Sequence, residues 1–106
     1  MTSSELQHAL AQSHDAGDVV CVKFTADWCR PCKDIQTFLE TLAQGHSHIH
    51  VYVTDVDQAH DLVKHFGVSS MPTFIFFRRN RVVYVLKGAD ENALQTTFNV
   101  ISGLIG

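Results

Sequence analysis

The chain has 106 residues, of which 45% are hydrophobic and 18% are charged. A chain of this length forms one domain around an ordinary hydrophobic core, and its composition excludes a disordered protein. The net charge of -3 argues against nucleic acid as the main partner, and three cysteines do not make a secreted disulfide framework. We therefore expect a single domain over residues 1–106.

Neither the start of the chain nor its apolar runs predict a membrane protein. The opening residues, MTSSELQ, lack the basic region and apolar core of a signal peptide. No apolar run approaches the roughly 18 residues that cross a membrane. A lone pair of cysteines with two residues between them is typical of a reducing compartment. We expect a cytoplasmic protein with no membrane partner.

Hydrophobic periodicity and turn signals predict eight elements, in the order helix, strand, helix, strand, helix, strand, strand, helix. Ser4 and Gln7 fit a capping box for the first helix, Gly45 fits the C-cap of the second, and Asp90 fits the N-cap of the last. The first helix runs from Ser4 and ends before Asp15, and the last follows Asp90. Between them we expect strands at 19–25, 49–53, 73–77 and 82–86, and helices at about 29–44 and 58–65. This order predicts an α/β fold in which helices cover both faces of a mixed sheet.

Two cysteines at the start of the second predicted helix carry the strongest chemical signal. Cys29 and Cys32 are three residues apart, so they share a helix face at a separation that a disulfide can span. A helix N-terminus stabilises a thiolate, which lowers the first thiol pKa from about 8.5 towards 3.5–7.5. Pro31 suits the first helical turn, and Arg30 and Lys33 add positive charge beside the sulfurs. We predict that Cys29 is an exposed attacking thiol and that Cys32 resolves the mixed disulfide.

Other interpretations of the polar and sulfur-containing residues are weaker. A zinc site would need a second ligand pair, and the remaining cysteine, Cys21, stands alone among valines as a small core residue. A purely structural disulfide would close a two-residue gap and constrain the unfolded chain very little. His46, His48 and His50 alternate and could place three imidazoles together, but no acidic or cysteine ligand stands beside them. A polar loop entering a strand is the favoured interpretation there.

Three segments in order, A-D-W-C-R-P-C-K, then M-P-T-F, then K-G-A-D, resemble the thioredoxin family over nearly the whole chain. The resemblance implies a thioredoxin fold in which Cys29 is the nucleophile, Cys32 the resolving cysteine and Trp28 the residue that shields them. It places Pro72 at the position of the family's cis-proline, where the preceding residue, here Met71, pairs with an extended client segment.

The resemblance also assigns Gly88 and Ala89 to the apolar client surface. The first strand of the family has almost no sequence left to form it, because only three residues precede the predicted N-cap. We therefore expect four to five strands flanked by four helices, with the first strand short or missing.

Two substitutions at the site depart from the family. Arg30 replaces the usual glycine, and we hypothesise that it stabilises the Cys29 thiolate and favours acidic clients; the alternative is a solvated surface side chain. Lys23 replaces the buried aspartate that assists proton transfer at the resolving cysteine, and Val53 replaces its usual lysine partner. A desolvated, neutral Lys23 amine could serve as the base, and a charged one would lower the pKa of Cys32. The alternative is a lysine whose head reaches water.

The sequence thus predicts a protein dithiol–disulfide oxidoreductase of thioredoxin type that reduces client disulfides through Cys29 and Cys32. We expect a monomer. No nucleotide-binding glycine motif occurs, so we expect no bound cofactor. The resemblance implies that a thioredoxin reductase, which draws on NADPH, reduces the protein again after each turnover. Two alternatives remain. One is a more oxidising oxidase or isomerase; the other is a non-catalytic interaction module that uses the surface around Met71 and Pro72.

Overall fold

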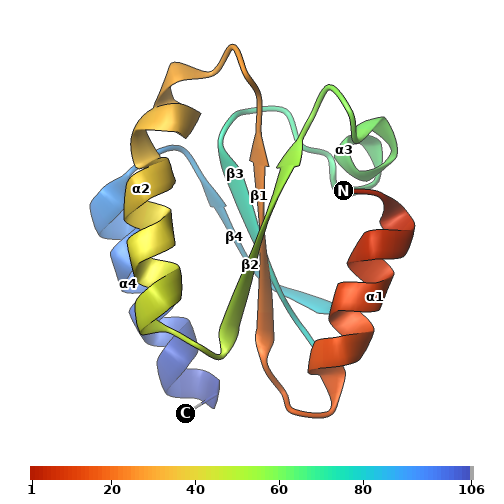
Figure 1. The fold of residues 1–106 in the computed structure, drawn as a ribbon, viewed down its shortest axis with the longest axis vertical. Helices are drawn as coiled ribbons and strands as arrows, with labels where there is room; N and C mark the ends of the chain where they lie inside the picture. Colours follow the sequence, from red (N-terminus) through yellow and green to blue (C-terminus); the bar gives the residue numbers. More distant parts are fainter. Residues whose placement is uncertain (106) are drawn as a thin grey trace.

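The computed structural model describes residues 1–105 and contains four helices and four strands in the predicted order. Figure 1 shows the sheet in the middle of the molecule, with a pair of helices on either side. The elements are α1 (Ser3–His14), β1 (Val19–Thr25), α2 (Arg30–Gly45), β2 (Ile49–Asp55), α3 (His60–Phe66), β3 (Thr73–Arg78), β4 (Arg81–Lys87) and α4 (Glu91–Ile105). No helix among these residues is both long and apolar enough to cross a membrane.

The four strands form one mixed sheet in the order β2-β1-β3-β4. Strand β1 pairs in parallel with β2, with Val19 opposite Ile49, and antiparallel with β3, with Val22 opposite Ile75. The central position of β1 agrees with its nearly continuous apolar sequence, since a strand covered on both faces needs no polar alternation. Within residues 1–105 no strand precedes α1. The predicted fold class is confirmed, and the sheet has four strands.

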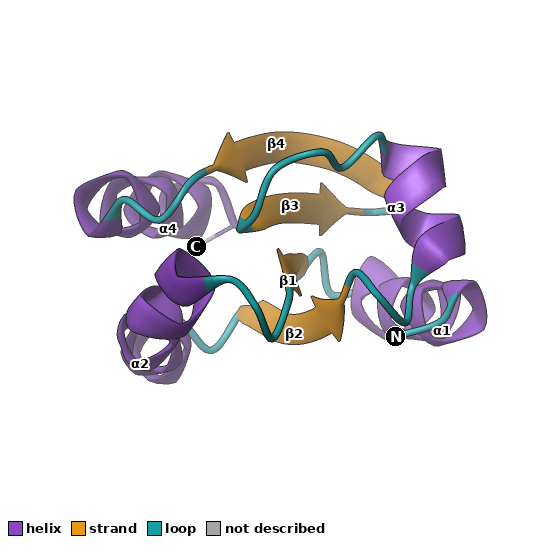
Figure 2. Ribbon diagram, turned by 90° about the horizontal axis from the view of Figure 1, so that it is seen from above, coloured by secondary structure: helices purple, strands orange, loops and turns teal. Residues whose placement is uncertain are grey.

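The helices lie in two layers, α1 and α3 on one face of the sheet and α2 and α4 on the other (Figure 2). Each layer encloses its own hydrophobic cluster. Leu6, Val20, Phe24, Leu62 and Phe77 belong to the first cluster. Ile35, Leu39, Phe74, Phe76, Leu94 and Phe98 belong to the second. The site cysteines join the first cluster, at the end of β1 where the chain enters α2.

The N-cap of the first helix lies two residues before the predicted one. Thr2, not Ser4, is the N-cap: its side chain accepts a hydrogen bond of 3.1 Å from the backbone N–H of Glu5. The Glu5 carboxylate in turn accepts from the backbone N–H of Thr2 at 3.0 Å. The prediction of a box between Ser4 and Gln7 was wrong, because a carboxylate is a stronger acceptor than an amide and gains more from the helix dipole.

The second helix also ends differently from the prediction. Gly45 is its last residue and not its C-cap, which is His46. The His46 ring lies within hydrogen-bonding distance of Ser102 Oγ, 2.6 Å away, and packs edge-on against Phe98. These contacts with α4 fix the end of α2, so a left-handed glycine is not needed there. Gly67, by contrast, adopts the left-handed conformation as the C-cap of α3.

Candidate redox site

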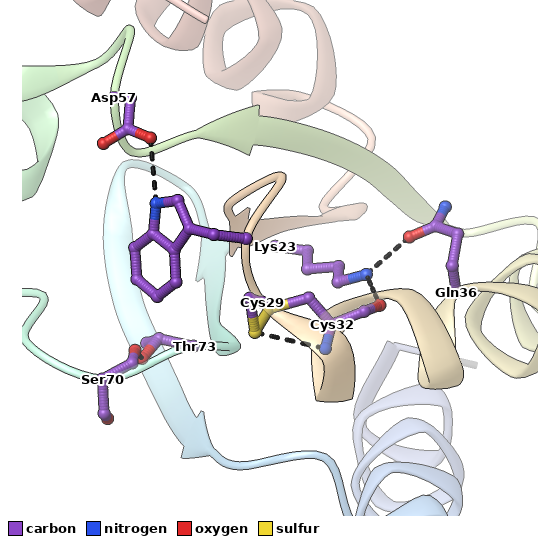
Figure 3. The surroundings of a disulfide bond; sticks show 8 residues. Lys23, Cys29, Cys32, Gln36, Asp57, Ser70 and Thr73 are labelled. Atoms are coloured by element: carbon purple, nitrogen blue, oxygen red, sulfur yellow. Dashed lines mark hydrogen bonds between the residues drawn. A yellow bond between two sulfur atoms is a disulfide. The ribbon is translucent and has the colours of Figure 1, made fainter.

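Cys29 and Cys32 form a disulfide at the start of α2, with their Cα atoms 5.4 Å apart (Figure 3). Cys29 is the N-cap residue of the helix and has extended backbone angles, whereas Cys32 lies in the first turn. Pro31 lies between them, at a position where a helix has no N–H bond to lose. The sequence therefore places both sulfurs at the positive end of a 16-residue helix.

The backbone itself stabilises negative charge on the first sulfur. The N–H of Cys32 points at Cys29 Sγ, 3.3 Å away, and this N–H is one of the helix donors without an intrahelical acceptor. In the reduced protein the same donor would favour a Cys29 thiolate over the thiol. Cys29 is only 5% exposed and Cys32 is fully buried, so the prediction of an exposed Cys29 was wrong for this oxidised state. Cys29 packs in the core cluster beside Ala26 and Ala59.

Arg30 does not direct an unpaired charge at the sulfurs. Its Nε donates to Asp34 Oδ1 at 2.9 Å, one helical turn further along α2, and both side chains are mostly exposed. An exposed ion pair of this spacing is screened by water and contributes little. Of the two interpretations of Arg30, this geometry favours the solvated surface side chain, because the Asp34 carboxylate offsets its charge.

Lys23 is the unusual residue of this site. It lies in the centre of β1, is 1% exposed, and extends behind the disulfide towards α2 (Figure 3). Its Nζ donates to the carbonyl oxygen of Cys32 at 2.7 Å and to Gln36 Oε1 at 2.6 Å. Among residues 1–105 no carboxylate lies within 4.0 Å of Nζ. The interpretation of Lys23 as a side chain whose head lies in water is excluded.

The surroundings of Lys23 shift its protonation. Burial lowers the pKa of Lys23, and the charge of Glu40, reached through a hydrogen bond from Gln36, opposes that shift. The residue opposite Lys23 on β2 is Val53, as predicted, which offers no charge. A cavity of about 300 Å³ opens beside the amine and is lined by Lys23, Cys32 and Gln36 among others. Lys23 thus lies beside the resolving cysteine with its pKa lowered by burial.

Trp28 has a partner that sequence reasoning missed. Its indole Nε1–H donates to Asp57 Oδ2 at 3.1 Å, although the Trp28 side chain is 69% exposed. Asp57 is itself held by a bond from its own N–H to Asp55 Oδ1 at 2.8 Å. The two aspartates, one at the end of β2 and one two residues beyond it, were visible in the sequence, but nothing in it placed them beside the cysteines.

The remaining predicted site residues meet on the loops around the disulfide. The peptide bond between Met71 and Pro72 is cis, as the resemblance implied. Gly88 N–H donates to the carbonyl oxygen of Pro72 at 2.9 Å, which joins the loop after β4 to the loop before β3. Met71 is half-buried against the cluster that contains Cys29, and Ala89 is exposed. The structure thus brings these loops together at one end of the sheet.

The other candidate residues lie away from the site. Cys21 is fully buried among the core side chains, and burial raises the pKa of its thiol. His48 and His50 both contact the carboxylate of Asp18, at 3.1 and 2.8 Å, while His46 faces α4. In the described part of the chain no set of three or more histidine, cysteine or acidic side chains is arranged to hold a metal ion.

The fold is a mixed sheet between two helical layers. At one end of it, two cysteines three residues apart lie at a helix N-terminus beside a cis-proline loop. This combination defines the class of dithiol–disulfide oxidoreductases. Comparisons with known proteins identify the family within this class. The family model described as Thioredoxin matches residues 1–99, and the chain belongs to the thioredoxin family. It is a dithiol–disulfide oxidoreductase of thioredoxin type, with protein-disulfide reductase activity.

Individual relatives agree over most of their length. Thioredoxin from Homo sapiens is 39% identical over 85 residues, which cover 79% of this chain and 81% of that protein. Thioredoxin from Equus caballus is 37% identical over 105 residues, covering 98% of this chain and 94% of that protein. The X-ray structure of Fasciola hepatica thioredoxin superposes with a TM-score of 0.88 at 30% identity, and the match covers 93% of each chain.

Proposed function

We propose that this protein reduces disulfides in client proteins, with Cys29 as the nucleophile and Cys32 as the resolving thiol. The single observation that supports these roles is the backbone N–H of Cys32 directed at Cys29 Sγ at the N-terminus of α2. It favours a thiolate on Cys29 and leaves Cys32 protonated one turn deeper.

The exchange proceeds in two displacements. The Cys29 thiolate attacks a client disulfide, forming a mixed disulfide and releasing the first client sulfur as a thiolate. Cys32 then loses its proton, and its thiolate attacks Cys29 Sγ, which releases the second client thiolate. Two client thiols are formed and the protein is left with the Cys29–Cys32 disulfide.

Lys23 is our candidate for the group that takes the Cys32 proton. Two acceptors, the Cys32 carbonyl and Gln36 Oε1, hold the amine in place, so its third position can carry either a proton or a lone pair. Burial favours the neutral form, which is the one that can accept a proton. Lys23→Met should slow resolution of the mixed disulfide by about a hundredfold. An unchanged rate in that variant would remove Lys23 from the mechanism.

The client surface is formed by Trp28, Met71, Gly88 and Ala89. Trp28 is exposed beside the disulfide, and the bond between Gly88 and Pro72 brings the other three to neighbouring loops. An extended client segment would lie across these loops, pairing its backbone with Met71. Arg30 is paired with Asp34, so the preference for acidic client segments that this surface can express is weak and depends mainly on the exposed Lys33.

We also propose an electron donor, a compartment and an oligomeric state for this protein. Re-reduction requires an external donor, and a thioredoxin reductase that draws on NADPH is the one that the family resemblance implies. The pair works as a reductant in a reducing compartment, for which the cytoplasm is our expectation. The chain acts as one domain and as a monomer, with no bound cofactor, no nucleic acid and no membrane partner.

A more oxidising enzyme is the alternative that a specific observation favours. If Lys23 stays charged, a buried cation next to Cys32 stabilises the dithiol form and raises the potential. The reduction potential of the Cys29–Cys32 pair, measured against glutathione in a Cys21→Ser background, tests this directly. A value near about -270 mV supports the reductase, whereas one between about -180 and -120 mV supports an oxidase or isomerase.

A trapping experiment separates catalysis from simple binding. In Cys32→Ser the first displacement occurs and the second cannot, so clients accumulate as mixed disulfides on Cys29. Release of these complexes by a reducing agent supports turnover of disulfide clients. A stable complex that forms equally well in Cys29→Ser would instead indicate a non-catalytic interaction module.

A further inference from the structure

Strand β4 is the most exposed strand of the sheet. It occupies the outer position beside β3, at the edge of the sheet in Figure 2. Four consecutive apolar side chains on it are between 42% and 48% exposed: Val82, Val83, Tyr84 and Val85. Exposed apolar residues on a free strand edge form a template for pairing with another chain.

The backbone of β4 offers hydrogen bonds on this edge. Lys87 lies opposite Thr73, and Gly88 N–H bonds to Pro72 O, so Gly88 points its backbone groups towards β3. Hydrogen-bonded residues alternate along an antiparallel strand. Leu86 therefore faces β3 as well, while Val85 and Lys87 direct their N–H and C=O groups away from the sheet.

A groove beside the strand can receive side chains. It has a volume of about 200 Å³ and lies between β4 and α4. Val83 and Tyr84 line it from the strand, and Val100 and Leu104, which are 59% and 69% exposed, line it from the helix. A strand paired with β4 would place every second side chain over this groove.

Charge decides which partner fits. Arg81 and Lys87 stand at the two ends of β4, and within residues 1–105 neither has a carboxylate within 4.0 Å. A second copy paired antiparallel about Tyr84 would place Arg81 of one copy opposite Lys87 of the other. Like charges directly opposite one another destabilise such a pair. An apolar strand with an acidic residue at each end satisfies both cations.

We propose that β4 is a docking edge for an extended segment of another protein, apolar in its centre and acidic at both ends. The segment adds a fifth strand to the sheet and inserts alternate side chains into the groove along α4. This contact does not use the cysteines, so it is independent of the redox state and of client reduction.

The probe is a synthetic peptide of alternating valine and threonine with a glutamate at each end, added to the oxidised protein. Amide exchange followed by NMR should show new protection at Val85 and Lys87, whose N–H groups are free without the peptide. The same peptide with a lysine at each end should bind about tenfold or more weakly.

Two variants of Val85 make a matched pair. Val85→Pro removes an N–H that does not bond to β3, so the sheet is retained and peptide binding is lost. Val85→Thr keeps the N–H and should bind as the wild type does, and both variants should reduce a small disulfide at the wild-type rate. Equal binding of both peptides, binding that survives Val85→Pro, or a dimer formed through β4 in sedimentation would overturn the proposal.

Discussion

The side-chain nitrogen of Lys23 lies 2.7 Å from the carbonyl oxygen of Cys32, the residue whose thiol must lose a proton during turnover. Two neutral acceptors hold the Lys23 amine, and no carboxylate of the described residues 1–105 forms an ion pair with it. The protonation state of Lys23 therefore affects both the free energy of unfolding and the reactivity of the Cys29–Cys32 pair.

Lys23 should give the oxidised protein a stability that rises with pH. Burial lowers its pKa in the folded state, while the unfolded chain keeps the proton up to about pH 10.4. Between the folded pKa and that value the unfolded state binds more protons, so the free energy of unfolding increases with pH. One proton limits the slope to about 1.4 kcal/mol per pH unit.

Guanidinium unfolding of the oxidised protein between about pH 7 and pH 10 measures this slope. In Lys23→Met the contribution of Lys23 to the slope should vanish. Lys33→Met, which removes an exposed lysine from the first turn of α2, is the control and should keep the wild-type dependence. Identical slopes for wild type and Lys23→Met would show that Lys23 is not shifted.

Arg30 should affect the reduction potential only slightly. Its ion pair with Asp34 is exposed, and such pairs contribute less than about 1 kcal/mol. For a two-electron couple that corresponds to a shift of no more than about 20 mV. We expect Arg30→Gly to lower the potential and Asp34→Asn to raise it, both within this range. A fall of about 60 mV or more in Arg30→Gly would mean that the guanidinium acts directly on the Cys29 thiolate.

Asp18 joins the starts of β1 and β2 by contacts with His48 and His50. The hydrogen bond with His50, followed by that with His48, lowers the pKa of Asp18. A carboxylate with a lowered pKa contributes stability above its unfolded value of about 3.9, and this contribution is lost as the pH falls through the folded pKa. Asp18→Asn should therefore cost about 1 kcal/mol at neutral pH and progressively less below about pH 4.

Thermal and denaturant unfolding of the wild type and Asp18→Asn, at neutral pH and below about pH 4, tests this prediction. Asp15→Asn is a suitable control, because Asp15 is fully exposed and, within residues 1–105, its carboxylate pairs only with the neighbouring His14. It should change the free energy of unfolding by less than about 0.5 kcal/mol. An equal effect of the two substitutions would contradict a specific role for the contacts of Asp18.

The bond from Trp28 to Asp57 should restrain the exposed indole next to Cys29. Trp28 is the one tryptophan of the chain, so its fluorescence reports this ring alone. Asp57→Ala should lower the fluorescence anisotropy of Trp28 and raise KM for a protein client several-fold, by about 1 kcal/mol, because one hydrogen bond is lost. Reduction of a small-molecule disulfide is the control and should change much less. Unaltered anisotropy in Asp57→Ala would show that packing alone holds the ring.

Local sequence signals determined most of the fold. The valine-rich run of β1, the apolar spacing of α2 and the glycine after α3 each specify their element through nearby residues. The placement of Cys29 and Cys32 at a helix start is equally local, because it depends only on a strand ending and a helix beginning around a fixed spacing. The ion pair of Arg30 with Asp34 could also have been found, since residues four apart meet on a helix.

The tertiary structure alone decided what long side chains reach. Lys23 could have turned its head to water, and only the packing of α2 against β1 brings Cys32 O and Gln36 within its reach. The same holds for Trp28 with Asp57, and for Asp18 with two histidines around the start of β2. These partners are separated by up to 32 residues in the chain. Their contacts arise from strand order and from how the layers pack, which local periodicity does not encode.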